Sequence, residues 1–171
     1  TGFSLAPPSP VLPEVRLKVF ERDNHTCQYC KFRAQKYQEV HILNGKSDDL
    51  RLENLATACI FCHQCFNLDK VGQMRSGVLI WLPELSQTDL HHIARAIYVA
   101  RVSQVPASEA AKRALDILMR RREEIKRRLG SEDPQLLAMV FREFLTDRQY
   151  TLREKKLEGV RLFPLDRRII R

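Results

Sequence analysis

The residues with the clearest chemistry are four cysteines arranged as two pairs. The pairs are Cys27-Gln-Tyr-Cys30 and Cys59-Ile-Phe-Cys62, and twenty-eight residues separate them. Two residues between cysteines let one tight turn present both sulfurs to a single ion at about 2.3 Å. Two such turns supply a closed tetrahedral shell, and four soft thiolates favour zinc, which needs no redox chemistry. The spacing therefore predicts one structural zinc ion held by Cys27, Cys30, Cys59 and Cys62.

Other roles for the cysteines fit the sequence less well. The first residues, TGFSLAPPSP, lack the charged and apolar regions of a secretory signal, so we expect a reducing compartment and no disulfides. Neither pair opens a helix after a βαβ pattern, as a redox motif would. Ordinary buried cysteines are the remaining alternative. We expect the fifth cysteine, Cys65, to be a small buried residue, or else an alternate ligand, and His25 to lie on the surface.

Short elements must position these cysteines in the N-terminal half of the chain. Residues 1–13 contain four prolines and predict an extended tail. A short helix over roughly 14–22 precedes the zinc module, Cys27–Lys70. A strand or extended segment is predicted for Val78–Leu82, because β-branched and aromatic residues lie there between a glycine and a proline. The helix is expected to pack four apolar side chains against the module: Val15, Leu17, Val19 and Phe20.

The rest of the chain has mostly helical spacing. Ser86, with an acidic residue three positions later, resembles a capping box, and apolar residues then recur at helical intervals. One helix is predicted over about 107–129, and Asp133-Pro134 predicts the start of another. A last helix, at about 148–157, precedes the extended segment GVRLFPL. The larger aromatic residues are expected in the core: Trp81, Phe141, Phe144 and Phe163.

These elements predict an α+β fold in two domains. A zinc-binding module over 14–82 follows the extended tail, 1–13, and an all-helical domain over 83–171 completes the chain. A hydrophobic content of 44% with 29% charged residues is typical of a globular protein. Because no run of about 18 apolar residues occurs, we expect no transmembrane helix.

The positive charge of the chain is confined to its C-terminal half. The net charge is +8, but residues 1–94 contain ten basic and ten acidic residues, whereas residues 95–171 contain nineteen and eleven. A nucleic-acid footprint would therefore belong to the second half. Six basic residues, Arg120–Arg122 and Lys126–Arg128, share a predicted helix with two glutamates. We expect a solvated face with internal ion pairs, or alternatively a docking surface for an acidic partner or membrane lipid.

A second set of residues lies between and beside the cysteine pairs. The order along the chain is CxxC, His41, Asn54, and then CxxC followed directly by His63. This arrangement resembles the four-cysteine form of the HNH endonuclease superfamily over roughly residues 19–70, with DDLRLENL and CxxCH at the family's spacing. The resemblance implies an HNH-like ββα-metal fold, with a β-hairpin ending near His41, a loop through Asn54, and a helix after Cys59 that bears His63.

The same resemblance implies roles for three residues. His41 would be the general base, Asn54 would brace the loop, and His63 would ligate a catalytic cation at the scissile phosphate. Two positions depart from the family: Val40 replaces an acidic residue or histidine that ligates this cation, and Asn44 replaces a proline. Because valine has no donor atom, we expect no nuclease activity. Asn54 keeps a structural role, since its amide can hydrogen-bond the loop backbone in an Asx-type turn.

A narrower resemblance covers roughly residues 19–105. The motifs CQYC and CxxCxxC, with LPELSQ soon after, are similar to those of the IcmJ/DotN family of the type IVB (Dot/Icm) secretion apparatus. This resemblance implies a zinc-containing component of the coupling complex, at the cytoplasmic face of the inner membrane. It also implies binding, without nuclease activity, to the cytoplasmic tail of the coupling ATPase, which recruits effector substrates.

The sequence therefore favours a non-catalytic adaptor, stabilised by one zinc ion, in a type IVB coupling complex. Its expected partners are the tail of the coupling ATPase and other coupling-complex subunits, with only indirect membrane association and no nucleic acid. Two other classes stay open. One is a metal-dependent HNH DNA endonuclease with His41 as general base. The other is a zinc-containing DNA-binding module that uses the basic helices, whose affinity would fall steeply with salt.

Overall fold

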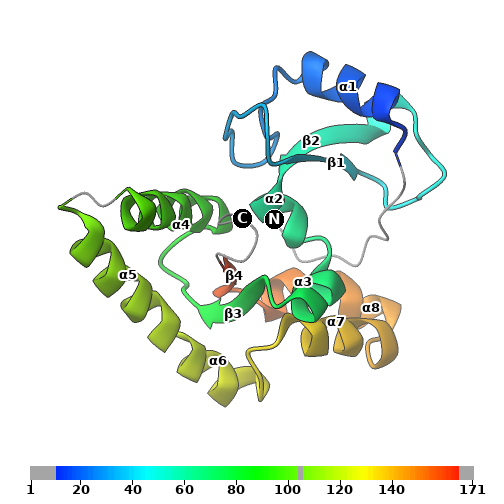
Figure 1. Ribbon diagram of the computed structural model, residues 1–171. Helices are drawn as coiled ribbons and strands as arrows, with labels where there is room; N and C mark the ends of the chain where they lie inside the picture. The colour runs from blue at the N-terminus through cyan, green and yellow to red at the C-terminus, as the bar shows by residue number, and fades with distance from the viewer. Residues whose placement is uncertain (1–10, 104–105, 166–171) are drawn as a thin grey trace. The chain divides into compact units, whose positions relative to one another are not determined.

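The computed structural model of the chain describes residues 11–103 and 106–165 (Figure 1). The chain divides into two compact units, of which the first ends at Asn67 and the second begins at Leu68. Each unit contains one antiparallel sheet of two strands, together with helices, among the described residues. This mixture of helices and short strands is the α+β class that the sequence predicted.

The first unit is built around a β-hairpin and a short helix. Helix α1 (Pro13–Arg22) is followed by strand β1 (Gln38–Ile42), the 3-10 turn η1 (Leu52–Asn54), strand β2 (Leu55–Cys59) and helix α2 (Ile60–Gln64). The strands pair antiparallel, with Gln38 opposite Cys59 and Ile42 opposite Leu55. The order strand, strand, helix is the ββα arrangement that the HNH resemblance implied.

A small apolar core fixes α1 on the hairpin. It contains five buried residues: Val11, Val19, Val40, Ile42 and Leu55. Val15 and Phe20 pack against this cluster from α1, but Leu17 is 57% exposed, so its predicted burial is wrong. On a helix, positions 15 and 19 share a face, whereas position 17 lies on nearly the opposite side.

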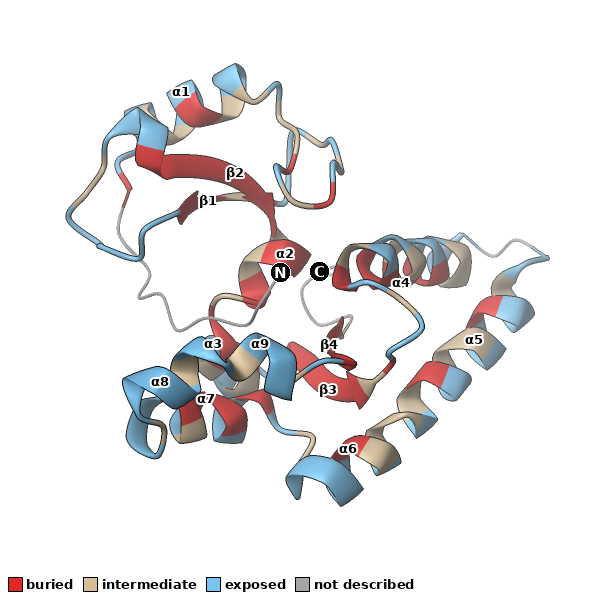
Figure 2. Ribbon diagram, turned by 180° about the vertical axis from the view of Figure 1, so that it is seen from behind, coloured by how far each residue is buried: buried red, intermediate tan, exposed pale blue. Residues whose placement is uncertain are grey.

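The second unit surrounds its own sheet with helices (Figure 2). Buried residues line strand β3, whereas the outer helices near the C-terminus are mainly exposed. The elements, in chain order, are α3 (Leu68–Met74), β3 (Gly77–Trp81), α4 (Gln87–Val102), α5 (Ser108–Arg120), α6 (Arg122–Leu129), α7 (Pro134–Glu143), α8 (Asp147–Thr151), α9 (Arg153–Lys156) and β4 (Val160–Pro164).

Side chains of α4 cover the outer edge of β4. The side-chain amide of Gln87 pairs with Leu162 as a neighbouring strand would: its Oε1 accepts from the Leu162 N–H at 2.9 Å, and its Nε2 donates to the Leu162 carbonyl at 2.8 Å. The Tyr98 hydroxyl donates to the Pro164 carbonyl at 2.7 Å. Because these buried backbone groups are paired, α4 is fixed against the sheet.

The helix predicted over 107–129 is instead two helices that meet at Arg121. The Arg121 carbonyl accepts a hydrogen bond from the Trp81 N–H, at 3.2 Å, on the outer edge of β3. In a continuous helix, the Arg121 carbonyl would accept a hydrogen bond from an N–H group of the next turn. Because it accepts from the strand instead, the helix is interrupted at Arg121. The helix predicted over 148–157 is likewise divided, between Thr151 and Arg153.

Two further differences concern burial and the domain boundary. Phe144, predicted in the core, is 68% exposed, because it lies at the C-terminal cap of α7, where the buried face of the helix has ended. The sequence placed the boundary after Leu82, whereas the compact units divide at Asn67. Strand β3 pairs with β4, which places the segment 68–82 in the second unit.

Candidate metal centre

Two tight turns position the cysteine pairs. In the first turn, the Cys27 N–H donates to the Phe32 carbonyl and the Lys31 N–H donates to the Cys27 carbonyl, both at 2.9 Å. Lys31 adopts a left-handed conformation, with φ of 61°, as the chain leaves Cys30. In the second turn, Cys59 ends β2 and caps α2, where its sulfur accepts the Cys62 N–H at 3.4 Å. Such N–H groups stabilise thiolate charge.

The structure brings the four predicted sulfurs to one point. All four Sγ atoms lie within 4.8 Å of one another, and all four cysteines are buried. The sulfurs of Cys30 and Cys59 are 3.6 Å apart, far longer than a disulfide bond of about 2.0 Å. A tetrahedral shell with metal–sulfur bonds of about 2.3 Å requires sulfur–sulfur separations of about 3.8 Å. Cys27, Cys30, Cys59 and Cys62 could therefore hold one metal ion.

The protonation of this cluster is uneven. The pKa of Cys27 is lowered, because Cys30, Cys59 and Cys62 hydrogen-bond to its sulfur. Hydrogen bonding with Cys27 raises the pKa of Cys30, but Cys59 and Cys62 lower it more, to about 6. The pKa of Cys62 is raised, first by Cys27 and then by Cys30 and Cys59. Four buried sulfurs at this spacing repel one another as thiolates, and a bound cation would remove that repulsion.

The other two sequence candidates near the cluster do not join it. Cys65 is buried and its sulfur donates to the Phe61 carbonyl at 3.7 Å, outside the group of four. Burial raises the pKa of this thiol to about 12, which is typical of an inert structural cysteine. His25 is half-buried rather than on the surface, and its ring lies 6.1 Å from that of Phe20.

His41, the predicted base, is covered by aromatic rings. Its side chain is stacked on Phe66 with the ring centroids 4.1 Å apart, and the ring of Tyr29 lies 5.9 Å away. The His63 ring is 6.0 Å from that of His41. Burial, with a smaller effect of His63, lowers the pKa of His41 to about 4, so the ring is neutral at pH 7. No motif in the sequence singles out Phe66, although Tyr29 lies between two predicted ligands.

Val40 points away from this histidine pair. Adjacent residues of a strand project to opposite faces, and Val40 lies in the apolar cluster with Val19 and Leu55. In the described part of the chain, the four cysteines are the single group of three or more His, Cys, Asp or Glu side chains close enough to share an ion. His41 and His63 therefore have no third such ligand among those residues.

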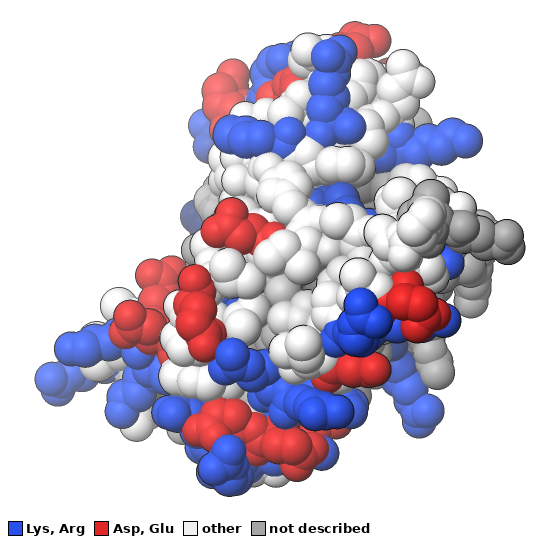
Figure 3. Space-filling model, turned by 90° about the vertical axis from the view of Figure 1, so that its left-hand side faces the viewer, with Lys and Arg blue, Asp and Glu red and all other residues white. Residues whose placement is uncertain are grey.

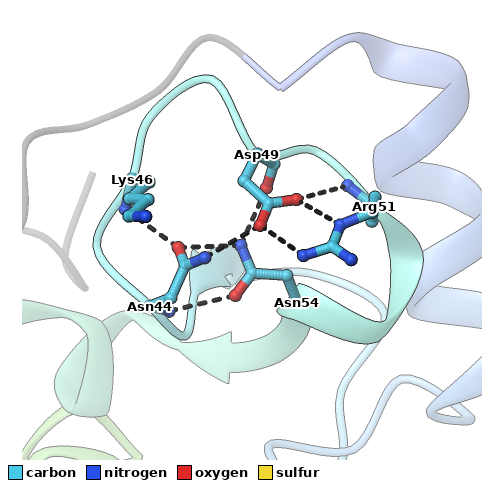
Figure 4. Close-up of polar contacts among 5 residues, drawn as sticks. All are labelled: Asn44, Lys46, Asp49, Arg51 and Asn54. Carbon is cyan, nitrogen blue, oxygen red and sulfur yellow. Dashed lines mark hydrogen bonds and ion pairs between the residues drawn. The ribbon is translucent and has the colours of Figure 1, made fainter.

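Asn54 fastens the loop between β1 and β2 (Figure 4). Its Oδ1 accepts from the Asn44 N–H at 3.0 Å, and its Nδ2 donates to the Asp49 carbonyl at 2.8 Å and to the Asn44 Oδ1 at 2.9 Å. The Asp49 carboxylate accepts two bonds of 2.8 Å from Arg51, which hold its pKa well below the usual range. Asn44, at the position of the family's proline, is thus part of the network, and Asn54 has the bracing role that the sequence predicted.

The comparison with known proteins tests the narrower of the two resemblances. No family model matches the sequence. Over 151 residues, however, the chain is 32% identical to the Type 4 apparatus protein DotN of Legionella pneumophila subsp. pneumophila (strain Philadelphia 1), a match that covers 86% of this chain and 70% of that protein. The chain belongs to the IcmJ/DotN family. The narrower resemblance, drawn from the cysteine motifs and LPELSQ, is thereby confirmed.

In this member of the IcmJ/DotN family, the basic run of the second half is largely neutralised from within. Lys126 contacts Glu132 at 2.8 Å, and Arg127 and Arg128 contact Glu124 at 2.5 and 2.7 Å. Basic and acidic side chains are interspersed in the space-filling view, without one continuous basic patch (Figure 3). This is the internally paired face that the sequence predicted, and it weakens the case for a nucleic-acid footprint on α6.

The described segments also bear on whether a helix of the chain could span a membrane. None of the helices in residues 11–103 and 106–165 combines the length and the apolar character needed to cross a bilayer.

Proposed function

We propose that this IcmJ/DotN family member is a non-catalytic adaptor subunit of a type IVB secretion coupling complex. In this role it binds the cytoplasmic tail of the coupling ATPase and helps to recruit effector substrates, at the cytoplasmic face of the inner membrane. The observation that carries the proposal is the family relationship, because the matched relative is a type 4 apparatus protein and the match spans 86% of this chain.

We further propose that the four cysteines hold one structural zinc ion. The support is the donor set: four buried sulfurs, all within 4.8 Å of one another, which match the four positions of a tetrahedral shell. Zinc accepts such a closed tetrahedral thiolate shell, and in structural sites its binding contributes directly to folding. The ion would fasten the turn before β1 to the junction of β2 and α2, and so hold the ββα module together.

The proposed absence of catalysis is supported by the surroundings of His41. A general base must reach a water molecule or substrate, but this ring is 6% exposed and stacked on Phe66. Val40 lies in the apolar core, where it cannot ligate a cation beside His63. Within the described residues, the ββα module has no second group of three or more metal-ligating side chains beside the four cysteines.

A binding measurement tests the adaptor role. Purified chain, loaded with zinc, is titrated by isothermal calorimetry with the recombinant cytoplasmic tail of the coupling ATPase from the same secretion system. We expect saturable binding with a defined stoichiometry. A tail from an unrelated conjugative coupling ATPase serves as the control. The proposal fails when neither calorimetry nor pull-down detects an interaction with the cognate tail.

One observation favours the second candidate, a metal-dependent HNH endonuclease. His41 and His63 project toward each other from a strand and a helix, with ring centroids 6.0 Å apart, as two site residues of a nuclease would. Plasmid DNA is incubated with the chain and magnesium, manganese or nickel. We expect no nicking. Cleavage that disappears in His41→Ala would replace the adaptor proposal with the nuclease.

A further inference from the structure

The outer face of α5 carries two arginines around an exposed isoleucine. Ala110, Arg113, Ile117 and Arg120 follow one another at intervals of three and four residues, which places them along one side of the helix. All four are exposed, and Ile117 retains 60% of its accessible surface. The opposite side of α5 buries Ala111 and Leu118. Packing of the second unit therefore uses the inner side, and among the described residues this stripe stays exposed.

These two arginines differ from the basic residues around them. Lys112 contacts Glu109 at 2.6 Å, and the basic residues of α6 contact glutamates of the same region. Neither Arg113 nor Arg120 forms an ion pair in the part of the chain that the structure describes, although Asp116 lies between them in sequence. The charge of Arg113 contributes to the lowered pKa of Glu109, after the larger effect of Lys112, but at this stripe the close ion pairs of the neighbouring basic residues are missing among the described residues.

The spacing of the stripe defines what would fit it. Arg113 and Arg120 are seven positions apart, which is about 10.5 Å along a helix, and Ile117 lies between them. Arginine forms two parallel hydrogen bonds with a carboxylate and keeps its charge at any physiological pH. An acidic amphipathic segment, with carboxylates two helical turns apart and an apolar side chain between them, complements the face in both charge and spacing.

We propose that the outer face of α5 binds an acidic amphipathic segment of the coupling-ATPase tail. Carboxylates of that segment pair with Arg113 and Arg120, and an apolar side chain covers Ile117. This assignment rests on the proposed adaptor function and adds to it the surface and the chemistry of the partner segment. It centres recognition on α5 and shares only Arg120 with the basic run at 120–128, for which the sequence left docking of an acidic partner as an alternative.

Charge reversal on α5 tests the assignment. Arg113→Glu/Arg120→Glu is compared with Lys112→Glu/Arg127→Glu, which changes the net charge equally at two exposed positions that already have acidic partners. The titrant is the recombinant cytoplasmic tail. We expect the α5 double variant to weaken binding at least about tenfold, and the control to change it by less than about twofold to threefold. Ile117→Ala is expected to weaken binding by about threefold to tenfold.

The outcomes separate this assignment from the adaptor function itself. A wild-type chain that fails to bind the tail overturns both. Wild-type binding that survives the α5 reversal, or that is lost equally in the control, keeps the adaptor function and overturns the role of α5. Because all the substituted side chains are exposed, the variants should fold. Unchanged zinc content and circular dichroism verify this, and Arg113→Gln/Arg120→Gln repeats the test without charge repulsion.

Discussion

The two units of the chain are stabilised in different ways. The first has a small apolar cluster of five buried residues, with the four cysteine sulfurs as its other centre. The second has a larger core around β3 and β4, in which side chains such as Ile80, Leu162 and Phe163 are fully buried. Small domains with little apolar core commonly depend on metals or disulfides, whereas larger cores do not. If the four cysteines hold a metal ion, as proposed, this difference predicts that the ion serves the folding of the first unit alone.

The strongest test of this contrast is removal of the metal. Chelation, or Cys59→Ser, should unfold the first unit while the second unit persists, because metal binding in such modules is worth on the order of 10 kcal/mol and is largely folding energy. Hydrogen exchange resolved by mass spectrometry locates the loss, which we expect within residues 11–67. Metal analysis of the purified wild type should give one zinc ion per chain.

A matched control exists in the fifth cysteine. Cys65 lies outside the group of four, so Cys65→Ala should keep the metal and the protection pattern of the first unit. If hydrogen exchange in residues 11–67 stayed unchanged after complete metal removal, the apolar cluster alone would be sufficient to keep the first unit folded, and the prediction would be wrong.

The converse experiment truncates the core of the second unit. Phe163→Ala removes a side chain with no accessible surface and should destabilise that unit by about 3–5 kcal/mol. Because Phe163 is remote in sequence from every cysteine, the metal content should remain that of the wild type. Denaturant unfolding followed by tryptophan fluorescence suits this measurement, since Trp81, the one tryptophan, lies in β3. Loss of zinc in this variant would mean that the units are not independent.

The contrast also explains which features could be predicted from sequence. The four-cysteine site could be predicted, because a Cys-x-x-Cys spacing is local and its geometry follows from the turn. The pairing of Gln87 with Leu162 could not, since it joins residues 75 positions apart. The break at Arg121 has the same origin, because its carbonyl is taken by Trp81 from a distant strand.

The sequence was also informative about the surroundings of His41, but only in part. Val40 could be compared with the ligand that the HNH resemblance implied, whereas the stacking of His41 on Phe66 depends on a tertiary contact that no spacing rule indicates. Leu17 is exposed because it lies on the side of α1 that faces away from the hairpin. Helical periodicity alone could have predicted this, since position 17 lies nearly opposite positions 15 and 19.

A smaller effect is expected from pH, through His41. Its pKa of about 4 in the folded chain lies below the ordinary 6.5, so the folded state favours the neutral ring. This contribution to stability is fully present above pH 6.5 and is lost as the pH falls toward 4, by on the order of 2 kcal/mol at pH 5. His41→Phe keeps an aromatic ring that cannot titrate, so its stability should fall less between pH 7 and pH 5 than that of the wild type. Equal slopes for the two proteins would show that burial of His41 does not shift its pKa.

The smallest effect is expected in the loop between β1 and β2, and it compares the loop network with the four-cysteine site of the same unit. Asn54→Ala removes the amide that links Asn44 to Asp49, and loss of these partly buried hydrogen bonds should cost about 0.5–1.5 kcal/mol. Exchange of amides in residues 43–54 should quicken, while the cysteine turns and the metal content stay unchanged, because the ion fastens other parts of the hairpin. Asp48→Ala, at an exposed position of the same loop, is the matched control and should have little effect. Faster exchange at the cysteine turns in Asn54→Ala would mean that loop and metal centre fold as one, and that the first unit depends on the loop network as well as on the ion.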